Sequence, residues 1–597
     1  MLDAGELPHL ASLRAAGGFG RVATTIPAQT PVAWSTFATG VNPGGHGIYD
    51  FIRRDPATYL PDLSLNRYEQ TSSFLPPKAV NLRRGVPVWE LLASAGIPAT
   101  VIRCPCTYPP DQPKGRLLSG MGVPDIRGGL GTSTFYTTQD GVAPEESEIV
   151  LPLTRDGARL RSRLVGPRIP KTGADAQLDI VLDVETAARR VVVRSDGSPG
   201  ALEVREGAWS DWLSVKFKLG MLQSVHGMVR FHLVRLEPHV ELYASPVNFD
   251  PRAPMFPISH PWDYAQELQK ATGTFYTTGM VEDHGGLNNG RFGEEAYLDQ
   301  CEQVMREREA MMEYELDRMK EGLFFCLFDT PDRLQHMLWR FREPEHPANR
   351  PAVRGERSAG GYRGAIEEHY RRCDQTAGKA LARAGGDALV IVLSDHGFSS
   401  FQRGVHLNSW LHANGFLALK PGAEPDDHGD FLKHVDFTRT KAYAVGLGSV
   451  YLNLEGREAD GIVTAADADA VAEQIRTGLT GLQDEARGEV AVRGVTTRRE
   501  AYSGAHAAES PDLVVLFNAG YRVSWATALG GVPRGLIEDN VKRWGGDHII
   551  DPLLVPGVLF MNRPFRADGA RLLDLAPTIL AALGAPRADH LEGSSLL

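Results

Sequence analysis

The chain has 597 residues, of which 42% are hydrophobic and 23% charged, and it carries a net charge of −11 at pH 7. This length predicts one large domain with insertions or several domains. The acidic balance argues against a nucleic-acid-binding surface, and no stretch approaches the roughly 20 apolar residues that span a membrane. Five cysteines without a regular spacing are typical of reduced thiols, so we expect a cytoplasmic protein.

Helical and strand patterns alternate over residues 1–124, which we interpret as the N-terminal part of an α/β domain. The periodicity predicts helices over residues 1–17 and 88–94, and strands over residues 20–25 and 99–103. The class that we expect is α/β, with a mostly parallel central sheet flanked by helices.

Thr30 and Pro31 precede an apolar segment that ends at Gly40. A hydroxyl residue before a proline is typical of a helix start, which makes Thr30 the cap of a helix over residues 32–39. Because N–H groups and the positive end of the helix dipole lie there, Thr30 is well placed to meet an anion. Considered alone, Thr30 is most simply a helix cap.

The pattern changes at residue 125, where glycine- and threonine-rich turns begin to alternate with short apolar runs. Such a pattern is typical of antiparallel strands, so residues 125–255 are interpreted as a β-rich insertion. No motif in this segment indicates a function. Strands are expected over residues 178–182, 190–194, 215–219, 228–233 and 240–244.

Residues 256–410 return to the α/β pattern and form the central part of the same predicted domain. The apolar run at 390–393 ends in Ser394-Asp395-His396-Gly397, as a buried strand does when it delivers polar groups to the edge of a sheet. Asp395 and His396 offer an oxygen and a nitrogen donor, a pair that suits Zn²⁺ or Mn²⁺. Helices are expected over residues 294–321 and 364–384, and a further strand over residues 323–328.

Asp332 and His336 follow that further strand and stand four residues apart. If Thr330 and Pro331 start a helix, both side chains lie on one face, as two ligands of one metal do. The alternative is an acidic residue favoured by the helix dipole beside an incidental histidine. Asp329, at the end of the strand, is the competing ligand.

The remaining sequence divides into a cap-like α/β segment over residues 411–540 and a C-terminal part of the main domain over residues 541–597. His548 follows Gly545-Gly546-Asp547 in a glycine-flanked loop, where a histidine is usually only solvated. His406 is another candidate and resembles a residue at the edge of a core. The pattern also predicts strands over residues 449–454, 513–517 and 558–561, and helices over residues 465–477 and 570–583.

A catalytic metal needs about three protein ligands, and taken together these residues provide one such set and part of a second. Asp332, His336 and His548 supply one set, and Asp395 with His396 supplies part of another. Two such ions roughly 4 Å apart clamp the attacking and leaving oxygens in phosphoryl transfer, with Thr30 as the hydroxyl that they would activate.

At this point the chain resembles the alkaline phosphatase superfamily, and within it the type I phosphodiesterase/nucleotide pyrophosphatase group. The resemblance covers nearly the whole chain except the β-rich insertion. It rests on segments that include Thr30-Pro31, Ser35 to Gly40, Pro43, His46-Gly47, Asp332 with His336, Ser394 to Gly397, Gly546 to His548, Tyr451 to Glu458, and Asp574 to Thr578.

The resemblance implies a role for each candidate. In that family the nucleophile lies nine positions before the threonine of the Thr39-Gly40 pair, which is Thr30 and not Ser35 or Thr36. The family pattern assigns Asp332, His336 and His548 to one divalent ion, and Asp395 and His396 to the other. The ions are expected to be Zn²⁺, with Mn²⁺ as the alternative.

One ligand of the family is missing. The second ion normally has a further aspartate at the end of a first strand, and this chain starts inside the helix that follows that strand. Asp3 is a poor substitute. We expect a start codon assigned too late, with a truncated chain or an impaired second site as alternatives. Any targeting signal would then lie upstream.

These observations predict a metal-dependent phosphoric ester hydrolase that acts on a small-molecule diester or nucleotide pyrophosphate. Thr30 would attack phosphorus, and water activated at the Asp332, His336 and His548 ion would release the product. The alternatives are a sulfatase or phosphonate hydrolase, a phosphomutase, or a catalytically impaired binding protein. The Cys/Ser-x-Pro-x-Arg context of sulfatases is absent around Thr30.

Overall fold

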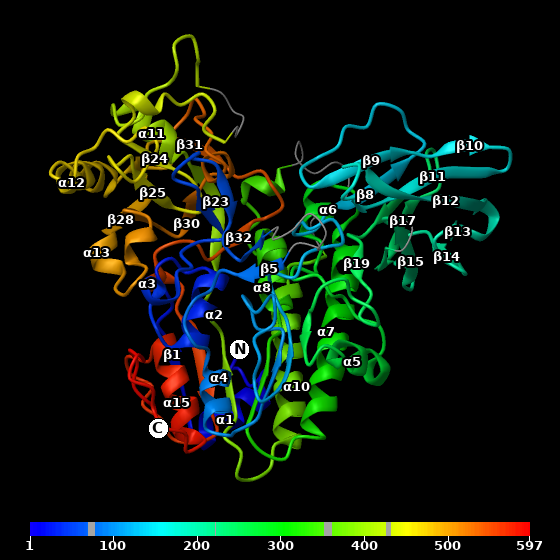
Figure 1. Ribbon diagram of the computed structural model, residues 1–597, viewed down its shortest axis with the longest axis horizontal. Helices are drawn as coiled ribbons and strands as arrows, with labels where there is room; N and C mark the ends of the chain where they lie inside the picture. Colours follow the sequence, from blue (N-terminus) through cyan, green and yellow to red (C-terminus); the bar gives the residue numbers. More distant parts are fainter. Residues whose placement is uncertain (70–77, 221–222, 351–360, 426–430) are drawn as a thin grey trace. The chain divides into compact units, whose positions relative to one another are not determined.

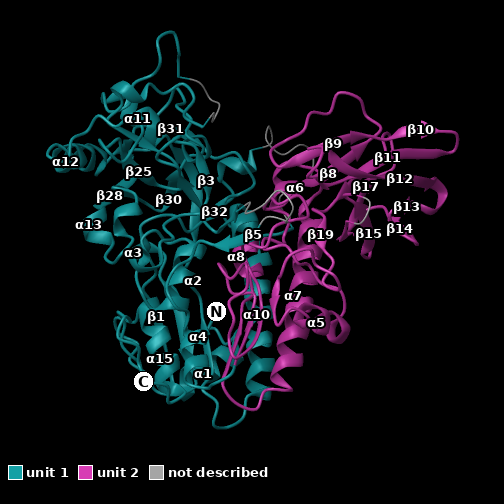
Figure 2. Ribbon diagram, viewed as in Figure 1, with its two compact units in different colours: residues 1–98, 335–597 teal, residues 99–334 magenta. Residues whose placement is uncertain are grey.

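The computed structural model describes residues 1–69, 78–220, 223–350, 361–425 and 431–597 (Figure 1). It is a mixed α/β protein, which confirms the predicted class. It divides into two compact units, residues 1–98 with 335–597 and residues 99–334 (Figure 2). The border falls inside helix α8 (Thr330–Leu338). Among the described residues, no helix is long and apolar enough to cross a membrane.

The first unit contains a three-stranded sheet in which β33 (Gly557–Met561) lies between β1 (Gly18–Val22) and β22 (Ile391–Leu393). β33 runs antiparallel to both neighbours, so β1 and β22 are parallel to each other. Helices α1 (Pro8–Ala16) and α10 (Ala365–Arg383) pack against each other beside this sheet. β22 is the strand that ends at Asp395 and His396.

A second sheet of this unit is built on β23 (Ser399–Val405), which follows β22 directly. It pairs in parallel with β30 (Gly520–Val523) and antiparallel with β31 (Ile537–Asp539). The short strand β32 (Gly546–Asp547) also pairs antiparallel with β23 and so brings the following His548 to the chain segment that leaves Asp395 and His396. The pairing of β32 with β23 thus brings His548 close to Asp395 and His396, although they are far apart in the sequence.

The first unit also contains a large apolar core that includes Trp410, Tyr443 and Phe517. Its N-terminal segment contains the helices α2 (Thr30–Thr39) and α4 (Val88–Ser94). The other elements are α3 (Pro43–His46), β2 (Ile52–Arg54), β3 (Pro61–Leu63), β4 (Asn66–Glu69), β5 (Lys78–Asn81), α11 (Leu407–Ala413), β24 (Ala442–Ala444), β25 (Ser449–Leu452), α12 (Ala468–Leu479), β26 (Gln483–Asp484), β27 (Glu489–Val490), β28 (Val492–Thr497), α13 (Arg498–Ala501), β29 (Leu513–Phe517), α14 (Trp525–Ala528) and α15 (Leu575–Ala582).

The second unit contains a four-stranded sheet in the order β20-β7-β6-β21, with parallel pairing among β7, β6 and β21. Its other described strands form three further sheets, and among the pairings described there β8 and β9 are the ones that run in parallel. The bounds are β6 (Ala99–Ile102), β7 (Gly115–Leu118), β8 (Ser133–Thr137), β9 (Glu148–Pro152), β10 (Thr154–Asp156), β11 (Arg159–Arg168), β12 (Asp175–Glu185), β13 (Arg190–Ser195), β14 (Ala201–Arg205), β15 (Leu213–Lys218), β16 (Ser224–Val229), β17 (Phe231–Arg235), β18 (Glu241–Ala244), β19 (Asn248–Phe249), β20 (Ser259–His260), α5 (Tyr264–Thr272), α6 (His284–Asn288), α7 (Glu294–Leu316) and β21 (Leu323–Cys326).

Some predicted bounds are wrong, for local reasons. The strand expected over residues 228–233 is two strands, because Arg230 leaves the ladder and its Nε donates to the Ser210 carbonyl oxygen. The helix expected over residues 1–17 begins only at Pro8, after a turn with Gly5 at φ 72°. The mostly parallel central sheet stays a prediction, since β33 is antiparallel and the described pairings run in both directions.

Candidate metal centre and nucleophile

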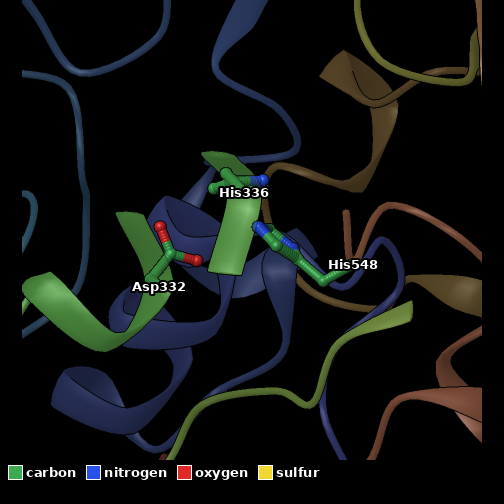
Figure 3. Close-up of side chains that lie close together, drawn as sticks. All are labelled: Asp332, His336 and His548. Carbon is green, nitrogen blue, oxygen red and sulfur yellow. The ribbon is translucent and has the colours of Figure 1, made fainter. Parts of the chain in front are cut away.

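Helix α8 presents Asp332 and His336 four residues apart, and His548 follows β32. Figure 3 shows these three side chains gathered together, and one ligand atom from each lies within 4.8 Å of the others. The structure thus brings together the three residues that the sequence assigned to one ion. A carboxylate and two imidazoles make the donor set of a zinc site that keeps further positions open.

Each candidate histidine is oriented by a backbone carbonyl. His336 Nδ1 lies 2.8 Å from the Gly546 oxygen, His548 Nδ1 lies 2.5 Å from the Ala28 oxygen, and His396 Nδ1 lies 3.1 Å from the Gly397 oxygen. Because a carbonyl oxygen can only accept, Nδ1 carries the hydrogen and Nε2 carries the lone pair of each neutral ring. Metal-ligating histidines are held in this way, so all three rings have the tautomer that a metal requires.

Asp395 and His396 lie directly beside the first group. The His396 ring stacks on the His548 ring with centroids 3.6 Å apart and an angle of 13°. Asp395 Oδ2 is 3.2 Å from His396 Nε2. Since Nδ1 holds the hydrogen of this ring, two lone-pair-bearing atoms face each other, and a cation between them would relieve their repulsion. The donors of both predicted sets therefore fit divalent ions.

Thr30 lies at the first residue of α2, and its hydroxyl is 3.2 Å from His396 Nε2. The prediction that Thr30 caps this helix is wrong by one residue, because Gln29 with an extended backbone occupies the N-cap. The Thr30 hydroxyl is thereby directed to a candidate metal ligand and not to the helix backbone. Thr30 keeps an exposed fraction of 8%, whereas Ser35, the next hydroxyl considered, has 0%.

The competing candidates have structural partners. Asp329 Oδ2 is 3.8 Å from the Nη2 atom of Arg308, and Asp329 is outside the metal-ligand group found among the described residues. His406 is buried, with Nδ1 2.7 Å from the Ser524 hydroxyl. Thr36 is 2.9 Å from His46 Nε2. These contacts explain the positions of the three side chains without requiring a bound metal or substrate.

Asp547 is a residue to which the sequence analysis gave no role, although it lies inside the quoted Gly546-Asp547-His548 motif. It is fully buried and forms an ion pair with Arg522, with Nε and Oδ2 2.8 Å apart. Burial by itself would raise the pKa of Asp547, but the neighbouring Arg522 charge and the hydrogen bond from the Trp544 indole oppose it, and the pKa is lowered to about 2. The position of Asp547 between a glycine and a candidate ligand was a signal in the sequence that it could have a role. Its ion-pair partner Arg522 is distant in the sequence and could not be identified from it.

The sequence model of the type I phosphodiesterase / nucleotide pyrophosphatase family matches residues 1–151 and 250–530 of the chain, which is more than half of it. No curated protein matches. Among solved structures, phosphonoacetate hydrolase from Sinorhizobium meliloti 1021 is similar over 98% of this chain and 91% of its own, with 13% identity and a TM-score of 0.41. Human ectonucleotide pyrophosphatase / phosphodiesterase 5 is similar over 98% and 92%, with 10% identity and a TM-score of 0.40. Alkaline phosphatase PafA is similar over 99% and 95%, with 12% identity and a TM-score of 0.39.

Proposed function

The chain belongs to the type I phosphodiesterase / nucleotide pyrophosphatase family, a family of phosphoester hydrolases, and from that premise we propose that it cleaves a phosphodiester or a nucleotide pyrophosphate with Thr30 as the nucleophile. One observation carries this proposal. The Thr30 hydroxyl lies 3.2 Å from His396 Nε2, and the His396 ring stacks on His548 of the Asp332, His336 and His548 group. A hydroxyl and the ligands that would activate it share one neighbourhood.

Two divalent cations, Zn²⁺ or alternatively Mn²⁺, fit the oxygen and nitrogen donors of these side chains. Asp332, His336 and His548 would hold one ion, and Asp395 with His396 would contribute to holding the other. When bound, such ions lower the pKa of a neighbouring hydroxyl or water and neutralise the negative charge that develops on phosphate oxygens.

The protein's own residues then define the course of the reaction. In the described state the Thr30 hydroxyl donates to His396 Nε2, which points the oxygen lone pairs away from the ring. The N-terminal end of α2 places the positive end of its dipole where a phosphate would sit. Thr30 Oγ1 forms a bond to phosphorus while the bond to the leaving oxygen breaks; the Thr30 hydroxyl proton passes to water, and the leaving oxygen takes up a proton from water, so that no net charge is gained or lost.

A second displacement restores the enzyme. Water attacks the phosphothreonine, the bond between Thr30 Oγ1 and phosphorus breaks, and Thr30 recovers its proton. The same two sets of ligands would serve both displacement steps, since the attacking and leaving oxygens exchange places between them. The net reaction adds one water across one phosphoester bond.

The first prediction tests the nucleophile. Thr30→Ala should lower the turnover of a bis-aryl phosphate by about a thousandfold or more, because the only oxygen that forms the intermediate is removed. Thr30→Ser should retain a measurable part of the turnover. The measurement is initial rate in Zn²⁺ or Mn²⁺ with the diester, the matching mono-aryl phosphate and an aryl sulfate.

Ser35→Ala is the matched control, since Ser35 lies in the same helix and is fully buried. It should keep its turnover. Unchanged turnover of Thr30→Ala would move the nucleophile elsewhere. If the wild-type chain hydrolyses none of the three esters with either metal, the proposed function is wrong.

A further inference from the structure

The buried pair of Asp547 and Arg522 lies beside the candidate ligands without belonging to them. The exposed fractions of the two residues are 0% and 1%. Arg522 comes from β30 and Asp547 from β32, two strands that both pair with β23. The pair therefore joins two chain segments at the sheet edge from which His548 extends.

The Asp547 carboxylate accepts hydrogen bonds on both oxygens. Oδ1 accepts from the backbone N–H groups of His548 at 2.8 Å and Ile549 at 3.1 Å. Oδ2 accepts from the indole N–H of Trp544 at 2.9 Å and faces Arg522 Nε at 2.8 Å. One carboxylate thus fixes the chain on both sides of itself, from residue 544 to residue 549.

This segment, residues 544–549, contacts His336 through a ring stack and two hydrogen bonds. The Trp544 ring stacks on the His336 ring with centroids 3.8 Å apart and an angle of 30°. Gly545 N–H donates to the His336 carbonyl oxygen, and the Gly546 carbonyl accepts from His336 Nδ1, both at 2.8 Å. The segment that Asp547 holds therefore contacts His336 and carries His548, which are two of the three grouped ligands.

Arg522 is itself locked in place. Its guanidinium lies over the rings of Phe401 and Trp525, at 4.8 Å and 4.1 Å from the centroids, and its Nη1 donates to the Val523 carbonyl at 2.9 Å. A buried ion pair contributes little to stability compared with apolar packing of the same volume, because both charges lose their hydration. Its position against two candidate ligands indicates a role in orientation.

We propose that Asp547, anchored by Arg522, is a positioning residue that aligns the rings of His336 and His548 for metal binding. The inference rests on the proposed function, because it presupposes that these rings bind a metal. Asp547 acts through the backbone and through Trp544 and contacts neither substrate nor metal. Loss of such a supporting partner typically lowers metal affinity by about 10- to 100-fold.

The test compares Asp547→Asn with Glu458→Gln in the full chain. Glu458 forms the matched control pair with Arg54, with Nη2 and Oε1 2.6 Å apart and side-chain exposures of 0% and 6%. Each variant removes one charge from a buried pair, but only the first touches the segment around His336. Zn²⁺ affinity is measured by competition with a chromophoric chelator, and ligand geometry by the visible absorption of the Co²⁺-substituted protein.

Asp547→Asn should bind Zn²⁺ about 10- to 100-fold more weakly and change the Co²⁺ absorption, while Glu458→Gln keeps the wild-type affinity and spectrum. Trp544→Phe, which keeps a ring over His336 but loses the indole N–H, should weaken binding less and covers the case in which Asp547→Asn fails to fold. Wild-type affinity and spectrum in the Asp547 or Trp544 variant, or equal losses in Glu458→Gln, would overturn the positioning role. If the wild-type chain binds no metal, the proposed function fails with it.

Discussion

His46 shows how a single buried side chain makes the protein sensitive to acid. Its ring has an exposed fraction of 0%, Nδ1 accepts from the Ile48 N–H at 3.2 Å, and Nε2 donates to the Thr36 hydroxyl at 2.9 Å. Burial, followed by the nearby Arg83 charge, lowers the pKa of His46 to about 3. The ring therefore stays neutral in the folded protein at pH values at which the unfolded chain is protonated.

This difference predicts the sign of a pH effect. The folded pKa lies below the usual value of 6.5, so the unfolded state binds more protons and the free energy of unfolding falls as pH falls from about 6.5 towards 3. The slope is about 1.4 kcal/mol per pH unit, or about 2 kcal/mol between pH 6.5 and 5. Urea unfolding should show a pH slope that is smaller in His46→Asn than in the wild type by this amount, since other buried histidines, such as His232, contribute a slope of the same sign in both proteins. Parallel pH profiles would contradict the assignment.

Among the secondary-structure elements, helix α1 depends on another helix for its start. Its N-cap residue Leu7 makes no side-chain cap bond. The carboxylate of Asp374 in α10 instead accepts from the N–H groups of Leu10 at 2.8 Å and His9 at 3.3 Å. A cap supplied from a distant part of the sequence joins α1 to α10 where Leu10, Leu13 and other side chains form a small core.

Asp374→Ala should therefore lower the free energy of unfolding by about 1 to 2 kcal/mol, the usual effect of losing a helix cap. Hydrogen exchange should accelerate first at the amides of Leu10 and His9. Asp374→Asn is the control, since its remaining oxygen can still accept from Leu10. Slow exchange of these amides in Asp374→Ala would show that the cap is dispensable.

Local signals explain which elements could be predicted. The helix over residues 88–94 and the strand over residues 513–517 were predicted at the bounds found, because an apolar pattern and its flanking residues agree. The start of α2 could not be placed, because the Gln29 Oε1 atom accepts from the Phe51 N–H and the preceding chain is extended. That contact is not local, and helix-start rules describe only neighbours.

The same distinction applies to the candidate site. Asp332 and His336 are one helical turn apart, so their shared face follows from helix geometry alone. His548 lies far along the chain, so no local pattern joins it to them; it was grouped with them by counting the donors that a metal needs, and then by the family resemblance. Asp547 could not be predicted, because its role depends on Arg522 and Trp544, whose contacts arise from the pairing around β23.

For the whole molecule, metal binding should raise the free energy of unfolding. A ligand that binds only the folded state raises the free energy of unfolding by about 4 kcal/mol when its free concentration is 1,000 times Kd. Zn²⁺ should raise the melting temperature of the chelator-treated protein, and a chelator should reverse the shift. Calorimetry with and without Zn²⁺ measures both.

His548→Ala should lose most of this shift, because one of three grouped ligands is removed. His406→Ala is the matched control: His406 is equally buried but lies outside the group, so this variant should keep the shift despite its own lower stability. Thr30→Ala should also keep most of it. An equal shift in all variants would mean that Zn²⁺ binds elsewhere.

The match to the family leaves out residues 152–249 and 531–597, and the first of these segments falls within the predicted β-rich insertion. Residues 152–249 contain β10 to β19 and carry ion pairs across their strands, for example between Arg159 and Asp183 at 2.7 Å. Such exposed pairs contribute little to stability. The interpretation of this segment as an insertion stays a prediction.

The partners of the three histidine Nδ1 atoms are main-chain oxygens, from Ala28, Gly397 and Gly546. No substitution can delete a main-chain oxygen, but a Cβ atom at Gly546 would lie 2.6 Å from the Gln335 carbonyl oxygen, and one at Gly397 would lie 2.8 Å from that of Pro556. The tautomer is thus selected by the backbone path, which places these carbonyl oxygens, and by the small residues that permit that path. Changing the hydrogen bonds of this centre by engineering would mean rebuilding loops, because exchanging the side chains of these three residues leaves their carbonyl oxygens in place.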